Sequence, residues 1–355
     1  MAIPIDVSGK TQSAAAWVNL GSAELVEVPC PKMNAGDILI EVEASGLCAT
    51  DHKVCGGHTP SAARNVIIGH EYAGTIVAIH PETHTQLALG DRIAVNPNIY
   101  CQACVYCHSA RVHLCQNLRA LGITTHGGME KYAVVPISQA VFVPPHVSPE
   151  AASLAEPLSC VLHAFDKGNV RTGHDVLVVG AGPVGCMLNA IVRAAGARCT
   201  VMEPNPARRK IVKEDFSADE VVDLDALPGC DGRFDVVFEC VGRTDAMENA
   251  LTCARPGGTV VWVGVARPDA VCKINPYLIY ARELTLRSSF TNPYTMQRAV
   301  RFLADGGLNV EKFVTHKFSL EDFPKAWEAF ERNDGLKICV MPNKSSAEIA
   351  AMTSN

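Results

Sequence analysis

The sequence predicts an α/β protein of two domains, in which a strand-rich segment is followed by a parallel sheet covered by helices. The chain has 355 residues, more than a single hydrophobic core usually accommodates. From about Trp17 to Pro144 it reads as short strands separated by Gly, Pro and Asn. From about Gly173 continuous apolar strands alternate with helical segments, which indicates a parallel sheet buried on both faces.

The individual elements follow from the local pattern. Three strands of the first segment are β-branched or nearly alternating, and they lie at 38–46, 72–79 and 91–97. The second segment predicts strands at 175–180, 199–203, 234–242 and 257–264, with helices at 183–196 and 205–216. Two amphipathic helices are expected at about 295–305 and 320–332, followed by a strand at 337–342 and a polar tail at 343–355.

Composition narrows the class of protein and of partner. Hydrophobic residues make up 48% and charged residues 19%, which is typical of a folded globular chain. The net charge is -6 without a dense basic stripe, so neither nucleic acid nor an anionic membrane is expected as a partner. No signal peptide and no apolar run of about 18 residues is apparent, so we expect a cytoplasmic protein. Its 15 cysteines should then be thiols or metal ligands rather than disulfides.

The stretch VVGAGPVG, residues 178–185, fits the pattern G-x-G-x-x-G between a buried strand and a helix. Glycines there permit a tight turn and let the backbone approach a pyrophosphate, which the helix N-terminus attracts. The residues expected to bind a dinucleotide are Gly180, Gly182, Pro183, Val184 and Gly185. An ordinary glycine turn is the alternative interpretation.

The choice between NAD and NADP depends on the end of the next strand. Glu203 lies at the separation expected for an acid that accepts hydrogen bonds from the adenosine ribose, and it would repel a 2′-phosphate. NAD is therefore the expected cofactor. Arg208 and Arg209 follow soon after, and they either bind a 2′-phosphate or lie on the solvated face of the next helix. Arg208 is included among the residues expected to bind the cofactor.

A second cluster has the spacing C-x2-C-x2-C-x7-C and consists of Cys101, Cys104, Cys107 and Cys115. Four thiolates within one loop can close a tetrahedron around a structural zinc ion. A [4Fe–4S] cluster is the competing use of closely spaced cysteines. A zinc ion would hold an irregular loop that has little core of its own.

A further set of possible metal ligands is scattered along the chain. Cys48 lies in GLCATDHK, His70 and Glu71 lie in IIGHEYAG, and Glu156 lies in SLAEPLSC. A thiolate, an imidazole and one or two carboxylates are typical of a catalytic zinc site, which keeps one position open. Taken singly, each has an ordinary alternative: core packing for Cys48, a satisfied buried histidine for His70, and a helix N-terminal carboxylate for Glu156.

These motifs together resemble the zinc-dependent medium-chain dehydrogenases, above all their polyol branch of sorbitol, arabinitol and threonine dehydrogenases. GLCATD, GHE, the four-cysteine loop, AEP and GAGPVG occur in the order seen in that family, and the resemblance covers nearly the whole chain. It implies a GroES-like catalytic domain at 1–155, completed by 293–355, and a Rossmann domain at 156–292.

The resemblance also implies roles for single residues. Cys48, His70 and Glu156 would bind the catalytic zinc, and Glu71 would be a direct ligand or exchange with water. Thr50 would pass the alcohol proton outward. Two positions depart from the family: Lys53 stands where a relay histidine is common, and Ser289-Phe290 stands about where sorbitol dehydrogenases place an Arg-Tyr pair.

The implied reaction is reversible oxidation of a secondary alcohol or sugar alcohol to a ketone with NAD. An amino alcohol or a biosynthetic carbonyl intermediate is the alternative substrate. A non-catalytic dinucleotide sensor or scaffold is the alternative of another class, and a zinc-free reductase on the same fold would need neither set of metal ligands. The family resemblance further implies a homodimer or homotetramer.

Overall fold

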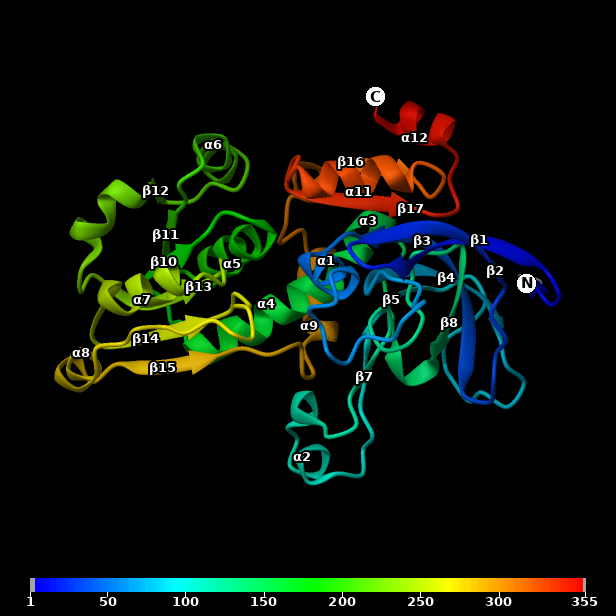
Figure 1. Cartoon of the computed structure of the whole chain (residues 1–355), viewed down its shortest axis with the longest axis horizontal. Helices are drawn as coiled ribbons and strands as arrows, with labels where there is room; N and C mark the ends of the chain where they lie inside the picture. The colour runs from blue at the N-terminus through cyan, green and yellow to red at the C-terminus, as the bar shows by residue number, and fades with distance from the viewer. Residues whose placement is uncertain (1–3, 354–355) are drawn as a thin grey trace. The chain divides into compact units, whose positions relative to one another are not determined.

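The computed structural model describes residues 4–353, which form two compact units (Figure 1). Unit 1 contains the chain up to Glu156, the segment Ala299–Asp305 and the residues from Phe313 onward. Unit 2 contains Pro157–Arg298 and Gly306–Lys312. Three helices run across these divisions: α4 (Ala155–Gly168), α9 (Met296–Ala304) and α10 (Val310–Phe313).

The second division lies several residues later than the sequence-based boundary after residue 292. Asn292 donates a hydrogen bond of 2.8 Å to the hydroxyl of Ser159, and the Thr295 hydroxyl donates to the Ser159 carbonyl at 2.7 Å. Arg298 forms an ion pair with Asp166 at 2.5 Å. These contacts attach the segment to α4 within unit 2, and a local hydrophobic pattern does not reveal them.

Unit 1 is built on a seven-stranded sheet of order β16-β17-β3-β4-β5-β9, with β8 paired to β3. Its strands are β3 (Asp37–Gly46), β4 (Glu71–Ile79), β5 (Arg92–Val95), β8 (Tyr132–Pro136), β9 (Ala140–Phe142), β16 (Val314–Ser319) and β17 (Lys337–Met341). In the antiparallel register Gly46, at the end of β3, faces Glu71 on one side and Cys339 on the other. The last residues of β3 are thereby flanked by the starts of β4 and β17.

The remaining elements of unit 1 lie outside this sheet. They are β1 (Thr11–Asn19), β2 (Ser22–Pro29), β6 (Asn98–Ile99), β7 (Arg119–Ala120), α1 (Ala49–Cys55), α2 (Val105–His108), α3 (Pro149–Ser153), α11 (Phe323–Glu331), α12 (Ser346–Thr353) and the 3-10 helices η1 (Val112–Leu114) and η2 (Ile137–Gln139). The segment expected as a polar tail thus contains α12, where Ser346 donates to Asp322 at 2.6 Å and Ile349 is buried.

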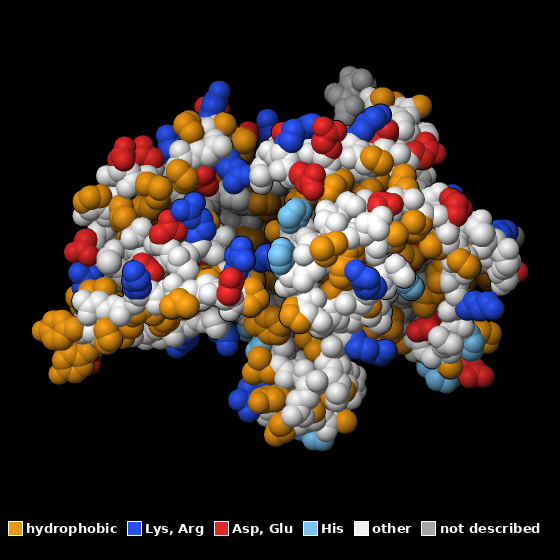
Figure 2. All heavy atoms as spheres, viewed as in Figure 1, with side chains coloured by type: hydrophobic (Ala, Val, Ile, Leu, Met, Phe, Trp, Pro, Cys, Tyr) orange, Lys and Arg blue, Asp and Glu red, His pale blue; other side chains and the backbone are white. Residues whose placement is uncertain are grey.

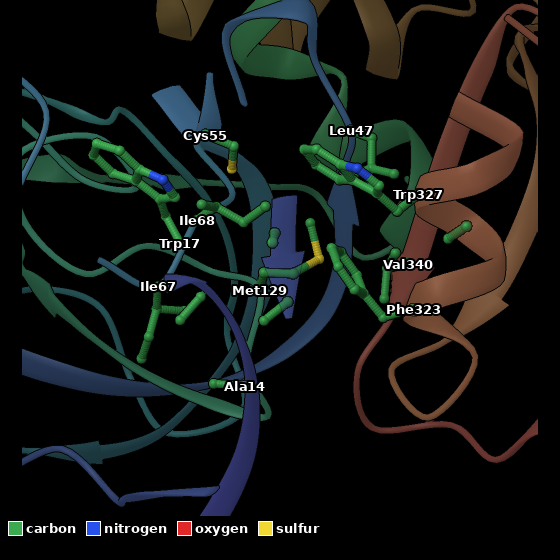
Figure 3. Packing of buried hydrophobic residues seen from close by; sticks show 14 of the residues in the cluster. Ala14, Trp17, Leu47, Cys55, Ile67, Ile68, Met129, Phe323, Trp327 and Val340 are labelled. Atoms are coloured by element: carbon green, nitrogen blue, oxygen red, sulfur yellow. The ribbon is translucent and has the colours of Figure 1, made fainter. Parts of the chain in front are cut away.

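One core of unit 1 joins the C-terminal segment to the N-terminal strands (Figure 3). Trp17 and Ile68 come from the first part of the chain, whereas Phe323, Trp327 and Val340 come from the last. All five side chains are less than a tenth exposed. Because burial of such a side chain contributes about 1.5–3 kcal/mol, this cluster ties α11 and β17 firmly to the N-terminal part of the chain.

A second feature of unit 1 is a buried acid beside the N-terminal strands. Glu130 is 3% exposed, and its carboxyl accepts a hydrogen bond of 2.6 Å from the Gln12 amide. Burial raises the pKa of Glu130 well above its usual value. The folded protein therefore keeps this proton over a pH range in which the unfolded chain has released it.

The free energy of unfolding of wild type should fall as the pH rises, because Glu130 must stay protonated in the folded protein. We expect this fall to be absent from the Glu130→Gln variant. Above the unfolded pKa of about 4.3 the unfolded wild type binds fewer protons than the folded protein, so its free energy of unfolding falls by up to about 1.4 kcal/mol per pH unit. Glutamine cannot ionise, and its carbonyl can still accept from Gln12. Urea unfolding at several pH values should show the variant gaining on wild type as pH rises from 5. Parallel pH profiles for the two proteins would contradict the assignment.

Unit 2 is a six-stranded parallel sheet of order β12-β11-β10-β13-β14-β15. Its strands are β10 (Asp175–Val179), β11 (Arg198–Met202), β12 (Glu220–Val222), β13 (Phe234–Glu239), β14 (Ala254–Trp262) and β15 (Thr285–Ser288). Its helices are α5 (Pro183–Ala194), α6 (Pro206–Glu214), α7 (Thr244–Cys253), α8 (Pro276–Arg282) and the 3-10 helix η3 (Leu224–Cys230). Chain order reverses between the neighbours β10 and β13. In such sheets ligands bind outside the carboxyl ends of the strands at this reversal.

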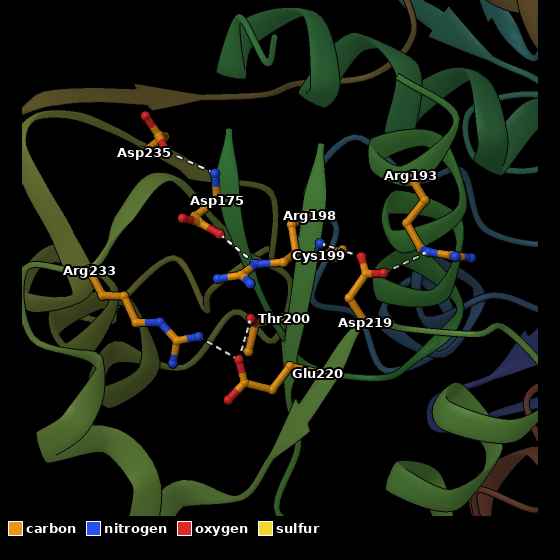
Figure 4. A network of polar contacts seen from close by, with 9 residues as sticks. All are labelled: Asp175, Arg193, Arg198, Cys199, Thr200, Asp219, Glu220, Arg233 and Asp235. Carbon is orange, nitrogen blue, oxygen red and sulfur yellow. Dashed lines mark hydrogen bonds and ion pairs between the residues drawn. The ribbon is translucent and has the colours of Figure 1, made fainter. Parts of the chain in front are cut away.

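The opposite end of the unit 2 sheet carries a network of polar contacts (Figure 4). Asp235 accepts a hydrogen bond of 2.8 Å from the Asp175 amide, and Arg198 pairs with Asp175 at 2.8 Å. Arg233 pairs with Glu220 at 2.5 Å. These charged side chains pair with one another, so this edge of the sheet has a structural role.

Among the described residues, no helix has the length and apolar character needed to cross a membrane.

Candidate catalytic metal site and dinucleotide loop

The possible catalytic metal site of unit 1 begins where β3 ends. Cys48 is the N-cap of α1, and its amide donates a hydrogen bond of 2.9 Å to the Asp51 carboxylate in the first turn. Asp51 is fully buried. The tight connection from β3 into α1 therefore fixes Cys48 at the end of a strand, with a carboxylate immediately beside it.

His70 and Glu71 reach the same place from the start of β4. The Cys48 sulfur, a His70 ring nitrogen and a Glu71 carboxylate oxygen all lie within 4.8 Å of one another. His70 is 5% exposed and Glu71 is 1% exposed. A half-buried thiol that converges with a buried imidazole and a buried carboxylate is a donor set that zinc prefers, so the geometry fits a bound zinc ion.

Asp51 also orients the histidine. Its carboxylate lies 3.1 Å from the Nδ1 atom of His70, which leaves Nε2 for a metal. Burial alone would lower the pKa of His70, but Asp51 and Cys48 outweigh burial and hold this pKa well above its usual value. The surroundings thus favour a positive charge at this point, which a divalent cation can supply.

Glu71 has a second partner, Lys337, from the start of β17. The Lys337 ammonium donates to Glu71 at 2.5 Å and to the Leu47 carbonyl at 3.1 Å. Both side chains of the pair are less than a twentieth exposed. A Cβ atom on Gly46 would lie 2.5 Å from the Glu71 carboxylate, so a larger residue at this position of β3 would have to displace that carboxylate.

Glu156 and Thr50 are placed differently. Glu156 is buried in the first turn of α4 and is not part of the group formed by Cys48, His70 and Glu71. The structure thus brings Glu71, rather than Glu156, together with the thiol and the imidazole. Thr50 is half-buried in the first turn of α1, two residues beyond Cys48.

Two residues of this site escaped the sequence analysis. Asp51 had a signal, because an acid three residues after an N-cap commonly accepts the cap amide. Lys337 had none: it lies 266 positions from Glu71, and only the pairing of β17 with β3 brings it there.

The four-cysteine loop forms the second group of metal ligands. The sulfur atoms of Cys101, Cys104, Cys107 and Cys115 all lie within 4.8 Å of one another. The Cys104–Cys107 and Cys101–Cys107 sulfur separations are 3.6 Å and 4.0 Å. Four sulfurs at about 2.3 Å from one zinc ion lie about 3.8 Å apart, so the spacing fits a single ion. The amides of Gln116 and Cys107 hold the pKa of the Cys104 thiol at about 6.

The glycine turn of unit 2 has the geometry expected of a phosphate-binding loop. Gly180 has a φ of 103°, and Gly182 is the N-cap of α5 with Pro183 in its first turn. A Cβ atom on Gly185 would collide with the Gly180 carbonyl. The turn therefore lies closely against the helix, and the N-terminus of α5 points its amides outward at the carboxyl edge of β10.

Glu203 supports this turn directly. It is 5% exposed and accepts hydrogen bonds from the Ala181 amide at 2.8 Å and the Asn205 amide at 2.9 Å. Arg208 is half-buried near the start of α6, and Arg209 donates to the Glu203 and Pro204 carbonyls. Val184 lies in the first turn of α5.

Comparison with known proteins agrees with both units. Residues 34–145 match the alcohol dehydrogenase GroES-like domain, and residues 183–305 match the zinc-binding dehydrogenase domain. D-altritol 5-dehydrogenase of Agrobacterium fabrum is 31% identical over 86% of this chain and 92% of its own. L-threonine 3-dehydrogenase of Pyrococcus horikoshii is 33% identical over 87% of this chain and 91% of its own.

The solved structures give the same result. A structure from Sinorhizobium meliloti, bound to NADP, superposes with a TM-score of 0.89 at 31% identity and covers 94% of this chain and 100% of its own. The predicted α/β fold, with GroES-like and Rossmann parts, is confirmed. The chain belongs to the zinc-dependent medium-chain dehydrogenases, in the group that contains polyol and threonine dehydrogenases.

Proposed function

We propose that this protein is an NAD(H)-linked, zinc-dependent dehydrogenase that interconverts a secondary alcohol, above all a sugar alcohol, and its ketone. The observation that carries the proposal is the convergence of Cys48 with the buried His70 and Glu71, in a chain that also has an intact glycine turn. A non-catalytic sensor or a zinc-free reductase would have no use for that donor set. Relatives named for altritol, arabinitol and galactonate support a polyol substrate.

The residues of unit 1 would share the chemistry as follows. Bound zinc makes a coordinated alcohol more acidic, and a bound dinucleotide carries the hydride. Cys48, His70 and Glu71 would hold the metal, with Glu156 as a further candidate ligand. Asp51 keeps the His70 ring in position. The Thr50 hydroxyl would take the alcohol proton toward solvent.

The choice of NAD rests on Glu203. Both of its oxygens already accept backbone amides, and each keeps lone pairs for the ribose hydroxyls. A 2′-phosphate would meet its negative charge. NADP remains the alternative, which Arg208 and the NADP-bound relative support. Glu203→Ala should therefore reduce the preference for NAD⁺ over NADP⁺.

An amino alcohol is the second candidate substrate. The relatives named L-threonine 3-dehydrogenase are as similar as the polyol dehydrogenases. Ser289 and Phe290 follow β15 at the carboxyl edge of the sheet, and Phe290 is 53% exposed. An exposed phenyl ring offers no hydrogen-bond donor to a chain of hydroxyl groups, so this position favours a smaller or less polar substrate.

The test is a screen of NAD⁺ and NADP⁺ reduction with polyols, sugar acids, amino alcohols and simple secondary alcohols. We expect turnover with one class of secondary alcohol and about two zinc ions per chain, one for each ligand group. Removal of the more labile zinc should abolish turnover. A protein that reduces neither cofactor with any alcohol, or that turns over without zinc, would contradict the proposal.

We also propose a homo-oligomer, a dimer or a tetramer. β15 is an edge strand of the unit 2 sheet, and such an edge is available for pairing with a second chain. Hydrophobic side chains gather on the neighbouring surface over α8 (Figure 2), where Tyr277 and Tyr280 are 71% and 79% exposed. Light scattering should give a multiple of the 37.9 kDa chain, and Tyr280→Glu should reduce it. A monomeric wild type would rule this out.

A cytoplasmic location is inferred from the thiols. All fifteen cysteines lie within the part of the chain that the structure describes, and each is a free thiol. Two groups of metal ligands depend on five of them remaining reduced. A reducing compartment keeps them so.

A further inference from the structure

Glu239 is a buried acid that neither the metal chemistry nor the glycine pattern requires. It is the last residue of β13 and is fully buried. Its Oε1 atom accepts the amides of Val241 at 2.7 Å and Gly242 at 2.8 Å. Its backbone carbonyl accepts the amides of Val263 and Gly264, both at 2.8 Å. One residue therefore holds its own loop and the loop after β14.

The two loops are packed backbone against backbone around this carboxyl group. A Cβ atom on Gly264 would lie 2.8 Å from the Glu239 Oε2 atom. Gly242 has a φ of 80°, and a Cβ atom on it would lie 2.8 Å from the Val265 amide. Neither position has room for a side chain, so the carboxyl group and the two glycines fix a single arrangement of the loops.

This arrangement reaches the glycine turn. The Cys240 amide donates to the Val179 carbonyl at 3.0 Å, and a Cβ atom on Gly180 would lie 3.0 Å from a methyl group of Val241. Val241 thus lies directly against the turn at the reversal between β10 and β13. Dinucleotides bind at this edge in folds of this kind.

A contribution to stability alone does not explain why a carboxyl group is buried at Glu239. Its Oε2 atom is buried and has no hydrogen-bond partner among the residues that the structure describes. Burial raises the pKa of Glu239, although the amides of Gly242 and Val241 partly oppose this. An apolar residue of similar size would avoid the cost of a buried polar atom that makes no hydrogen bond.

We propose that Glu239 is a positioning residue of the dinucleotide site, which sets Val241 and Gly242 against the glycine turn so that the cofactor meets a preformed surface. This proposal rests on the proposed dehydrogenase function, because it assumes that the turn binds NAD(H). It adds a residue from the fourth strand of the sheet to a site otherwise described by the turn and by Glu203.

The experiment compares Glu239→Leu and Glu239→Gln with wild type in zinc-loaded full-length protein. The Kd of NADH is measured by fluorescence titration, together with KM for NAD⁺ and kcat. Leucine cannot accept the two amides, so we expect Kd and KM to rise by about tenfold or more with a smaller change in kcat. Glutamine keeps the acceptor and should restore wild-type binding.

The matched control is Asp235→Leu, at the other end of the same strand. Asp235 is also buried and accepts a backbone amide, from Asp175, but it lies at the amino edge. Its substitution should lower the melting temperature and leave the Kd of NADH unchanged. This separates a general weakening of β13 from a change in the cofactor loops.

The outcomes are distinct. Wild-type affinity in a folded Glu239→Leu protein would overturn the proposal and leave the dehydrogenase function standing. If the leucine variant does not fold, Glu239→Asp takes its place, because its shorter side chain cannot reach both amides; wild-type binding by that variant would again overturn the proposal. A wild type that binds neither NADH nor NADPH would refute the proposed function itself, and this inference with it.

Discussion

Cys48→Ser should abolish turnover while leaving the protein folded and able to bind NADH. The thiolate is the strongest zinc donor of the group formed with His70 and Glu71, and a serine hydroxyl does not ionise to replace it. A Lewis-acid metal supplies several kcal/mol of transition-state stabilisation, so kcat should fall by about 1,000-fold or more. Metal analysis should show about one zinc ion per chain lost and the other retained in the four-cysteine loop.

The matched control for this prediction lies in the same helix. Cys55 is fully buried at the end of α1, and burial raises the pKa of its thiol to about 12, so it behaves as a small apolar residue. Cys55→Ser should therefore lower the melting temperature but keep both zinc ions and wild-type turnover. Retention of two zinc ions by Cys48→Ser would show that Cys48 is not a ligand.

The parts of the protein that were predictable from sequence are those encoded over short distances. The glycine turn and the four-cysteine loop each occupy fewer than twenty consecutive residues, and spacing alone states which atoms can meet. Four of the six strands of the parallel sheet were also predicted, because burial on both faces leaves continuous apolar runs such as 176–179 in β10. The short strands β12 and β15 were not predicted. The α/β class followed from these local patterns, whereas the family was implied by the resemblance of the motifs to known dehydrogenases; both are confirmed.

The sequence predicted which kinds of side chain form the catalytic metal site, but not which of the candidate carboxylates joins it. Cys48, His70 and Glu71 meet because β3 and β4 pair in one register, in which Gly46 faces Glu71. A sequence indicates which side chains can bind zinc, but the choice between Glu71 and Glu156 depends on how β4 and α4 are positioned in the fold. Lys337 illustrates the same limit, since no local pattern distinguishes its lysine from those on the surface.

Lys337→Met should make the stability of the protein depend far more strongly on zinc. In wild type without metal, the buried carboxylate of Glu71 still has the Lys337 ammonium at 2.5 Å. Methionine fills the same volume without charge and leaves Glu71 unpaired, which typically costs about 3–5 kcal/mol for a buried pair. Bound zinc would then be the main remaining partner for Glu71. The melting temperature of the zinc-free variant should fall well below that of zinc-free wild type, while the zinc-loaded proteins should differ less.

Zinc affinity and turnover should move in opposite directions in this variant. A carboxylate that has lost its ammonium partner binds zinc more tightly, so we expect slower release of zinc to a chelator and a lower kcat.

Lys317→Met is the matched control: Lys317 pairs at 2.6 Å with Glu150, another largely buried acid of unit 1 that belongs to neither group of metal ligands. That substitution should cost similar stability with and without zinc. Equal losses for Lys337→Met in the two states would mean that Glu71 and the metal do not interact.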